Sequence, residues 1–111
     1  MLDHRIPQDV QLALKELQDY LAKVYGERLR GVYLYGSYAR GDFHPDSDID
    51  VLIALEGTTN PGQEIDRIGD GVADICLDHN VLIGTFPVPE DWLQERKSPL
   101  FENVRREGVR L

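Results

Sequence analysis

The fold is decided by Tyr33-Leu34-Tyr35-Gly36-Ser37-Tyr38-Ala39-Arg40-Gly41, then residues 42–47, then Asp48-Ile49-Asp50-Val51-Leu52-Ile53. An apolar run of β type ends in a Gly-Ser turn, a polar loop follows, and a second apolar run opens with two carboxylates. Residues i and i+2 of a strand point to the same face of a sheet. Asp48 and Asp50 are therefore expected to stand side by side, opposite the Gly36-Ser37 turn.

These residues suit a metal–triphosphate complex. Two adjacent carboxylates repel each other unless a cation holds them, and Mg²⁺ binds through one or two carboxylates together with substrate phosphates. Gly36 allows a phosphate to approach the backbone, and the Ser37 hydroxyl can donate a hydrogen bond to it. Residues 37–40 are expected to begin a short helix, in which Arg40 can add a charge-assisted contact.

The pattern of Gly36-Ser37, ten residues and Asp48-x-Asp50 resembles the signature of the nucleotidyltransferase superfamily that includes DNA polymerase β. The nearest branch by these motifs is the minimal nucleotidyltransferases (MNT), often encoded beside HEPN-domain partners. The resemblance is strong over residues 29–55. It implies an α+β domain with a mixed sheet of three to four strands flanked by helices. It also implies ATP as substrate, two Mg²⁺ ions on the catalytic Asp48 and Asp50, and nucleotide contacts from Gly36, Ser37 and Arg40.

The same resemblance implies what the chain acts on. MNT antitoxins suggest transfer of AMP to a tyrosine of a HEPN-type toxin, so a helical protein partner is expected. Two alternatives remain open at this point: a binding module that neutralises a partner by contact, and the nucleotide-binding subunit of a two-chain transferase acting on a small molecule.

One feature departs from the family pattern, because catalytic members generally use a third carboxylate on the strand beside the D-x-D strand. The expected strand at residues 81–88 reads Val-Leu-Ile-Gly-Thr-Phe-Pro-Val and contains no acid. The remaining candidates are Asp74 and Asp78, if residues 73–77 were a strand, and Glu90 and Asp91, if a loop brought them to the site. Helical spacing of the apolar residues before Cys76 argues against a strand there.

Composition limits the function classes. The 111 residues are enough for one domain, residues 1–111, and carry 12 basic and 20 acidic residues for a net charge of −8. Without a basic stripe, direct binding of nucleic acid is not expected. The lone Cys76 fits a reducing compartment, and neither a signal peptide nor a membrane-spanning run is apparent, so the cytoplasm is expected. A homo-oligomer remains open.

Apolar periodicity and turn residues predict the order of elements. We expect helices over residues 8–25, 63–79, 90–97 and 98–107, and strands over residues 29–35, 48–55 and 81–88. The prolines at 87 and 89 predict that the last strand lies at an edge of the sheet.

Overall fold

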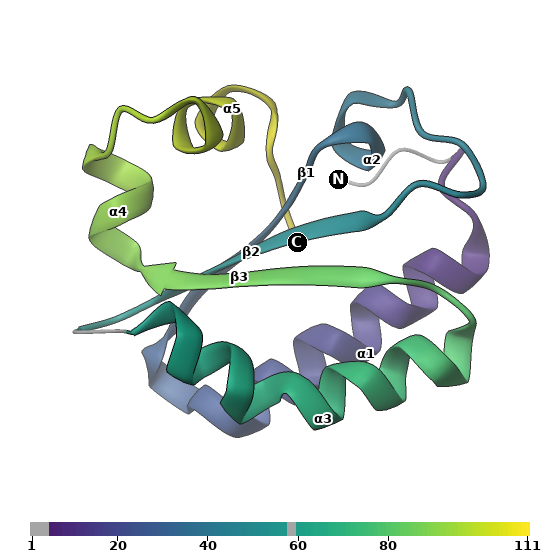
Figure 1. Cartoon of the computed structure of the whole chain (residues 1–111), viewed down its shortest axis with the longest axis horizontal. Coiled ribbons are helices and arrows are strands. Elements are labelled where there is room, and N and C mark those ends of the chain that lie inside the picture. The colour runs from purple at the N-terminus through teal and green to yellow at the C-terminus, as the bar shows by residue number, and fades with distance from the viewer. Residues whose placement is uncertain (1–4, 58–59) are drawn as a thin grey trace.

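The computed structural model describes residues 5–57 and 60–111 as a four-stranded sheet with helices on both of its faces (Figure 1). The elements, in chain order, are α1 (Gln8–Tyr25), the 3-10 turn η1 (Gly26–Arg28), β1 (Leu29–Tyr35), α2 (Ser37–Arg40), β2 (Ile49–Leu55), α3 (Pro61–His79), β3 (Ile83–Pro89), α4 (Glu90–Glu95), α5 (Pro99–Glu107) and β4 (Val109–Arg110). No helix of the described residues has the length and apolar character needed to cross a membrane.

The sheet is mixed, as the sequence predicts. Its strand order is β3-β2-β1-β4, with β1 antiparallel to β2 and to β4 and with β2 parallel to β3. The prediction that β3 lies at an edge is confirmed, although the strand covers Ile83–Pro89 rather than residues 81–88. The two-residue strand β4 is not among the strands expected from the sequence; it pairs with Tyr33 and Leu34 of β1.

The strand β2 lies inside the molecule and is covered on both faces. The larger core lies between the sheet and the helices α1 and α3, and it includes Ile49, Val51, Ile53 and Leu55. A second cluster lies between the sheet and the helices α4 and α5, and it includes Leu52 and Ala54. Because side chains alternate along a strand, Asp50 lies on the same face as Leu52. The even and odd positions of β1 divide in the same way, with Val32 and Leu34 in the larger core and Tyr33 and Tyr35 against the smaller cluster.

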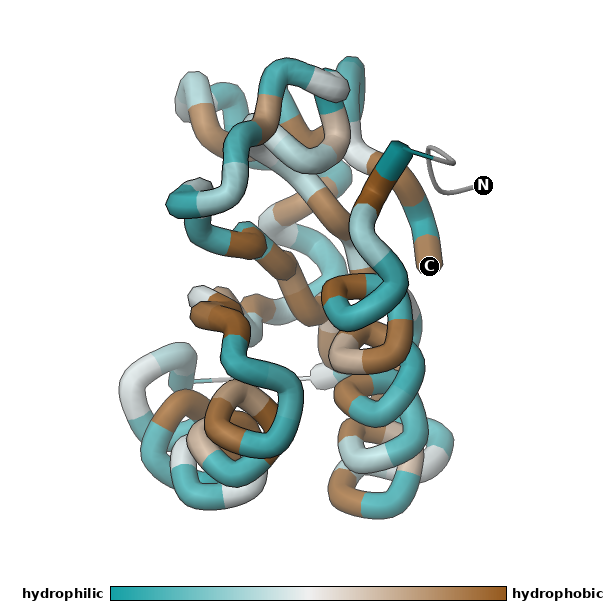
Figure 2. Tube along the Cα trace, turned by 90° about the vertical axis from the view of Figure 1, so that its right-hand side faces the viewer, coloured by the Kyte–Doolittle hydropathy of each residue, from teal (hydrophilic) through white to brown (hydrophobic). Residues whose placement is uncertain are grey.

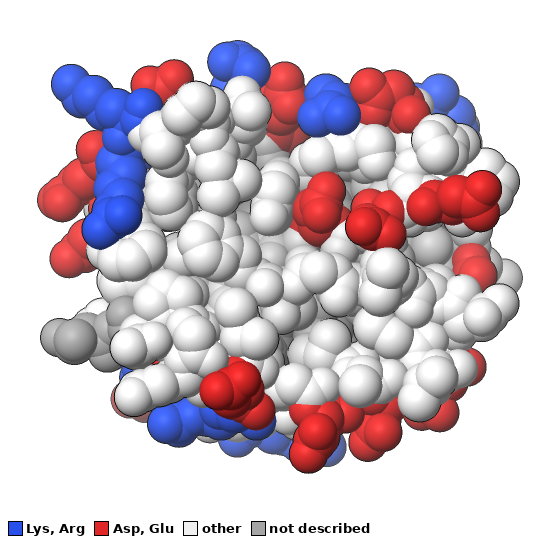
Figure 3. Space-filling model, viewed as in Figure 1, with Lys and Arg blue, Asp and Glu red and all other residues white. Residues whose placement is uncertain are grey.

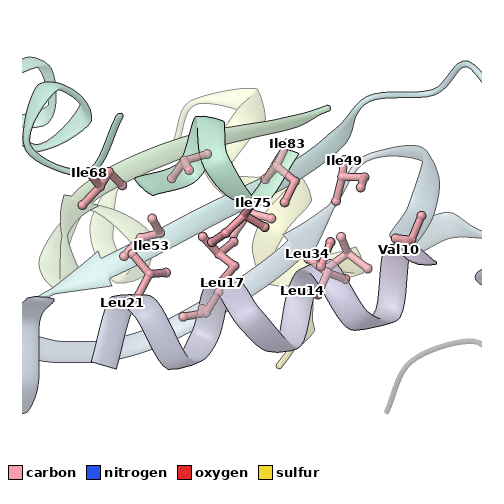
Figure 4. Packing of buried hydrophobic residues seen from close by; sticks show 14 of the residues in the cluster. Val10, Leu14, Leu17, Leu21, Leu34, Ile49, Ile53, Ile68, Ile75 and Ile83 are labelled. Carbon is pink, nitrogen blue, oxygen red and sulfur yellow. The ribbon is translucent and has the colours of Figure 1, made fainter. Parts of the chain in front are cut away.

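The helices α1 and α3 lie side by side below the sheet, as Figures 1 and 2 show. Their apolar stripes interlock beneath the strands in the larger core, as the labelled side chains in Figure 4 show. The α3 helix begins earlier than expected, at Pro61, because the Asn60 side chain accepts a hydrogen bond from the Gln63 amide. It ends at His79, and the following residue, Asn80, caps it in a left-handed conformation.

A buried hydrogen bond joins the two helices within this core. The Tyr25 hydroxyl donates to Glu64 Oε1 at 2.9 Å, and Arg67 Nε lies 3.2 Å from the same oxygen. The Glu64 residue is only 5% exposed, so its carboxylate depends on these partners in place of water. Burial, followed by the bond to Glu64 and its charge, raises the pKa of Tyr25.

Replacing Tyr25 with Phe is therefore expected to lower the free energy of unfolding by about 1–3 kcal/mol, because a buried acceptor loses its donor. Urea unfolding measures this change. The matched control is Tyr20→Phe, since the Tyr20 hydroxyl lies a long 3.5 Å from the Ile68 carbonyl and should matter less. Equal losses in both variants would contradict the assignment.

Candidate functional site

The site is built on the turn that follows β1. The strand ends at Tyr35, and Gly36 then adopts φ +75° and ψ −152°, a conformation that side chains beyond glycine rarely take. Its carbonyl accepts hydrogen bonds at 3.1 Å from the amides of Ala39 and Arg40, which closes the single turn of α2. The predicted Gly-Ser turn and short helix at residues 37–40 are thus present.

The two aspartates stand beside this turn. Asp48 is exposed and directly precedes β2, whereas Asp50 is half-buried and pairs with Tyr35 across the antiparallel ladder. The Asp50 carboxylate closely approaches Gly36, because a Cβ added there would overlap Asp50 Oδ2. A residue larger than glycine at position 36 would occupy the space that this carboxylate takes.

The charge state of Asp50 follows from its surroundings. Burial first, and the charge of Asp48 second, raise the pKa of Asp50, while the positive charge of Arg40 opposes this shift. Burial and the Asp50 charge likewise raise the pKa of the Tyr35 hydroxyl. Asp48 and Asp50 therefore carry like charges whose repulsion Arg40 offsets only in part.

A single pocket gathers all five residues predicted for the site. It is about 550 Å³ in volume. Its lining consists of Tyr35, Gly36, Ser37, Arg40, His44, Ser47, Asp48, Asp50, Leu100 and Asn103. Arg40 is part of this lining. Its guanidinium group forms ion pairs with Asp42 at 3.2 Å and with Glu107 at 3.7 Å. The five residues come together because β1 and β2 are antiparallel neighbours.

Sequence reasoning missed the contribution of α5. Leu100 and Asn103 line the pocket opposite the turn, and the Asn103 Oδ1 atom accepts a hydrogen bond from Arg106. Their i, i+3 spacing places them on one face of a helix. That spacing does not specify which element the face packs against, because the position of α5 beside the sheet is set by the tertiary fold.

The loop between α2 and β2 is closed by hydrogen bonds between its own residues. The Ser47 hydroxyl accepts a hydrogen bond from the His44 amide at 3.0 Å, and the Ser47 amide donates to the His44 carbonyl at 2.9 Å. Ser47 therefore closes the loop that delivers Asp48 to the site. The His44 residue is exposed at the border of the pocket.

None of the four candidates for a third carboxylate joins the pair. Asp74 and Asp78 are exposed on α3, which covers the opposite face of the sheet, so the helical prediction for residues 73–77 is confirmed. Glu90 and Asp91 begin α4, after β3 has run parallel to β2 to its far end. Asp50 pairs with Gly84 and Leu55 with Pro89, and five residues at about 3.3 Å each separate the two ends by roughly 16 Å.

The donor chemistry fits a hard divalent cation, although it is incomplete. Carboxylate oxygens are the protein ligands that Mg²⁺ uses, and a cation would offset the repulsion from Asp48 that, after burial, raises the pKa of Asp50. Over residues 5–57 and 60–111, no three His, Cys, Asp or Glu side chains converge on one point. Asp48 and Asp50 would thus share a cation with oxygens from outside the chain, such as nucleotide phosphates.

Comparison with known proteins gives one family. Residues 13–96 match the family model of the nucleotidyltransferase domain. A candidate protein adenylyltransferase of Methanocaldococcus jannaschii is 32% identical over 97 residues, which cover 86% of this chain and 91% of that protein.

Solved structures share the fold. A toxin–antitoxin structure with AMP-PNP superposes with a TM-score of 0.60 at 19% identity, covering 94% of this chain and 72% of the other. A candidate minimal nucleotidyltransferase gives a TM-score of 0.59 at 22% identity, covering 96% and 99% of the two chains. The α+β architecture predicted from the sequence is thus confirmed.

Replacing Gly36 with Ala tests the contact between the turn and Asp50. The backbone strain alone should cost about 1–3 kcal/mol of folding stability, and the added methyl group should displace the carboxylate and weaken binding of Mg²⁺ and AMP-PNP. Gly26→Ala is the matched control, since Gly26 also has a positive φ of +55° but no atom near the position of its absent Cβ. Titration calorimetry measures the affinity for Mg²⁺ and AMP-PNP, and urea unfolding measures the stability. Equal losses of affinity in the two variants would refute the role of the Gly36–Asp50 contact in ligand binding.

Replacing Asp50 with Asn tests the charge state, with divalent cations chelated. A raised pKa means that the ionised carboxylate destabilises the folded chain above that pKa, and that this cost vanishes once the pH falls below the ordinary value of 3.8. The variant should therefore unfold at higher urea than the wild type near pH 7, and the difference should close near pH 3. Asp46→Asn, on the exposed loop, is the control. A stability difference between variant and wild type that grows as the pH falls would contradict the raised pKa of Asp50.

Proposed function

Because this chain belongs to the nucleotidyltransferase family, we propose that it transfers AMP from ATP to a hydroxyl group of another protein. The observation that carries the proposal is the convergence of Gly36, Ser37, Asp48 and Asp50 on one pocket. The candidate activity of the archaeal relative, protein adenylylation, agrees with it.

The reaction needs an attacking oxygen, a phosphorus atom and a leaving group in line. The acceptor hydroxyl oxygen attacks the α-phosphorus, the bond from that phosphorus to the bridging oxygen breaks, and pyrophosphate leaves with the electron pair. The hydroxyl proton passes to solvent. Catalysis of this kind depends on positioning and on electrostatic stabilisation, which a small pocket with fixed donors supplies.

Each site residue has a part in this positioning. The Gly36 turn lets the β- and γ-phosphates lie against the backbone, and the Ser37 hydroxyl donates to them. Arg40 adds positive charge at the border of the pocket. Asp48 and Asp50 would hold two Mg²⁺ ions together with phosphate oxygens; when bound, Mg²⁺ neutralises the charge of the attacking and leaving oxygens.

The acceptor is expected to be a protein partner. One structural neighbour is a toxin–antitoxin complex with AMP-PNP. We propose by analogy that the acceptor is a tyrosine of a HEPN-type toxin and that the transfer inactivates it. The net charge of −8 opposes a nucleic-acid acceptor, whose phosphates would be repelled.

A second candidate is a module that neutralises its partner by contact alone. It is favoured by the two-carboxylate site of the described residues, which would hold a metal less tightly than a site with three. The close fit of the Asp50 carboxylate against Gly36 favours catalysis, because a scaffold has no use for a half-buried charged pair. We therefore prefer the transferase.

The decisive test is label transfer from ATP carrying a labelled α-phosphate, with Mg²⁺, the purified chain and host lysate. Asp48→Asn and Asp50→Asn should each lower the transfer about a hundredfold or more, since each removes charge that holds the metal. Asp46→Asn, exposed two residues before Asp48, should retain it.

The outcomes separate the two candidates. A labelled protein band that vanishes in both site variants supports transfer. Wild-type turnover in either variant would refute the metal assignment. Binding of Mg²⁺ and AMP-PNP without any transfer would favour the contact-only module.

A further inference from the structure

We propose that the acceptor hydroxyl enters across the edge strand β3, over Gly84, on the opposite side of Asp50 from the nucleotide. This inference rests on the proposed transferase function and names the route and the kind of acceptor for the same site.

The first observation is the direction of the two Asp50 oxygens. Oδ2 is the oxygen that approaches Gly36, whereas Oδ1 lies 3.9 Å from the position that a Cβ of Gly84 would occupy. Gly84 is the residue of β3 paired with Asp50. The carboxylate thus lies between two glycines, one on the phosphate-binding turn and the other on the open edge of the sheet.

The chemistry distinguishes these two sides. In-line transfer places the attacking oxygen opposite the leaving pyrophosphate. If Gly36 and Ser37 hold the β- and γ-phosphates, the attacking hydroxyl must come from the other side of the α-phosphorus. On the β3 side, Gly84 is the exposed residue that lies nearest to Asp50 in the sheet.

The backbone does not require a glycine at this position. Gly84 is absent from the described glycines with positive φ, and Asp50 Oδ1 is the sole atom of the described residues, chain neighbours aside, within 4 Å of its absent Cβ. A side chain would fit without strain and would narrow the open side of Asp50. Glycine within a strand weakens it and is typical of places where a ligand approaches the backbone closely.

The surroundings favour a neutral protein side chain as the acceptor. Leu82, two residues earlier, is 61% exposed and lines a second pocket of about 560 Å³ that also borders Asp48. Phe86, two residues later, is half-buried against Phe101. On this side of the molecule, where β3 runs in Figure 1, Figure 3 shows a broad uncharged surface, with acidic groups at its right and lower margins and both basic and acidic groups at its upper and left margins. An uncharged approach suits a neutral tyrosine side chain, and the net charge of −8 repels the anionic end of a nucleic acid.

The test uses Gly84→Ala and Gly84→Leu, with N-acetyltyrosinamide as the acceptor probe. Thr85→Leu is the matched control on the same strand, because Thr85 lines a separate open groove with Ile83 and Val72. Transfer to the probe, release of AMP to water and affinity for AMP-PNP with Mg²⁺ are measured for each variant, and urea unfolding verifies its fold.

We expect Gly84→Leu to lower kcat/KM for the probe about tenfold or more, since a displaced nucleophile loses its alignment. Gly84→Ala should give a smaller loss in the same direction. AMP-PNP affinity and release of AMP to water, a small acceptor, should stay near the wild-type values in both, and Thr85→Leu should leave all three unchanged.

Unchanged transfer to the probe in Gly84→Leu would overturn the route while leaving the transferase function intact. A parallel loss of AMP-PNP affinity would also overturn it, because Gly84 would then belong to the nucleotide side. If the wild type transfers to neither probe nor water but labels a protein of the lysate, that protein replaces the probe; if it labels none, the proposed function itself fails, and the route fails with it.

Discussion

The site depends on a half-buried negative charge at the open end of a fully buried strand. Both faces of β2 pack against apolar side chains, so its position in the molecule is fixed by the core. Asp50 extends that strand into the pocket, where burial and Asp48 both disfavour its ionised form. The packing of the sheet thus offsets the cost of placing two like charges at the end of β2.

Two glycines give this charge its geometry. Gly36 leaves room for one carboxylate oxygen of Asp50 at the turn, and Gly84 leaves the other oxygen open toward the sheet edge. The conformation of Gly36 is one that other residues rarely adopt, whereas nothing in the backbone at Gly84 demands glycine. The turn is therefore constrained by backbone sterics, whereas the open edge at Gly84 is where we propose that the acceptor enters.

The direction of β3 determines which acids can act. Because β3 runs parallel to β2, it begins beside Asp50 and ends beside Leu55. Glu90 and Asp91, which follow it directly, are carried to the far end of the sheet. An antiparallel strand would have returned them toward the site, so the direction of β3, together with the absence of an acid within it, leaves the described residues with a two-carboxylate centre.

The sequence by itself determined the Gly36-Ser37 turn, the placement of Asp48 and Asp50 side by side, and which residues of β1 and β2 share a face. Each follows from local rules, namely the two-residue period of a strand and the conformational freedom of glycine. It could not place Asn103 in the pocket, detect β4 or show that Gly84 borders Asp50. Those facts depend on which elements pack together and in which direction strands run, and side-chain patterns specify the buried face of an element without specifying its partner.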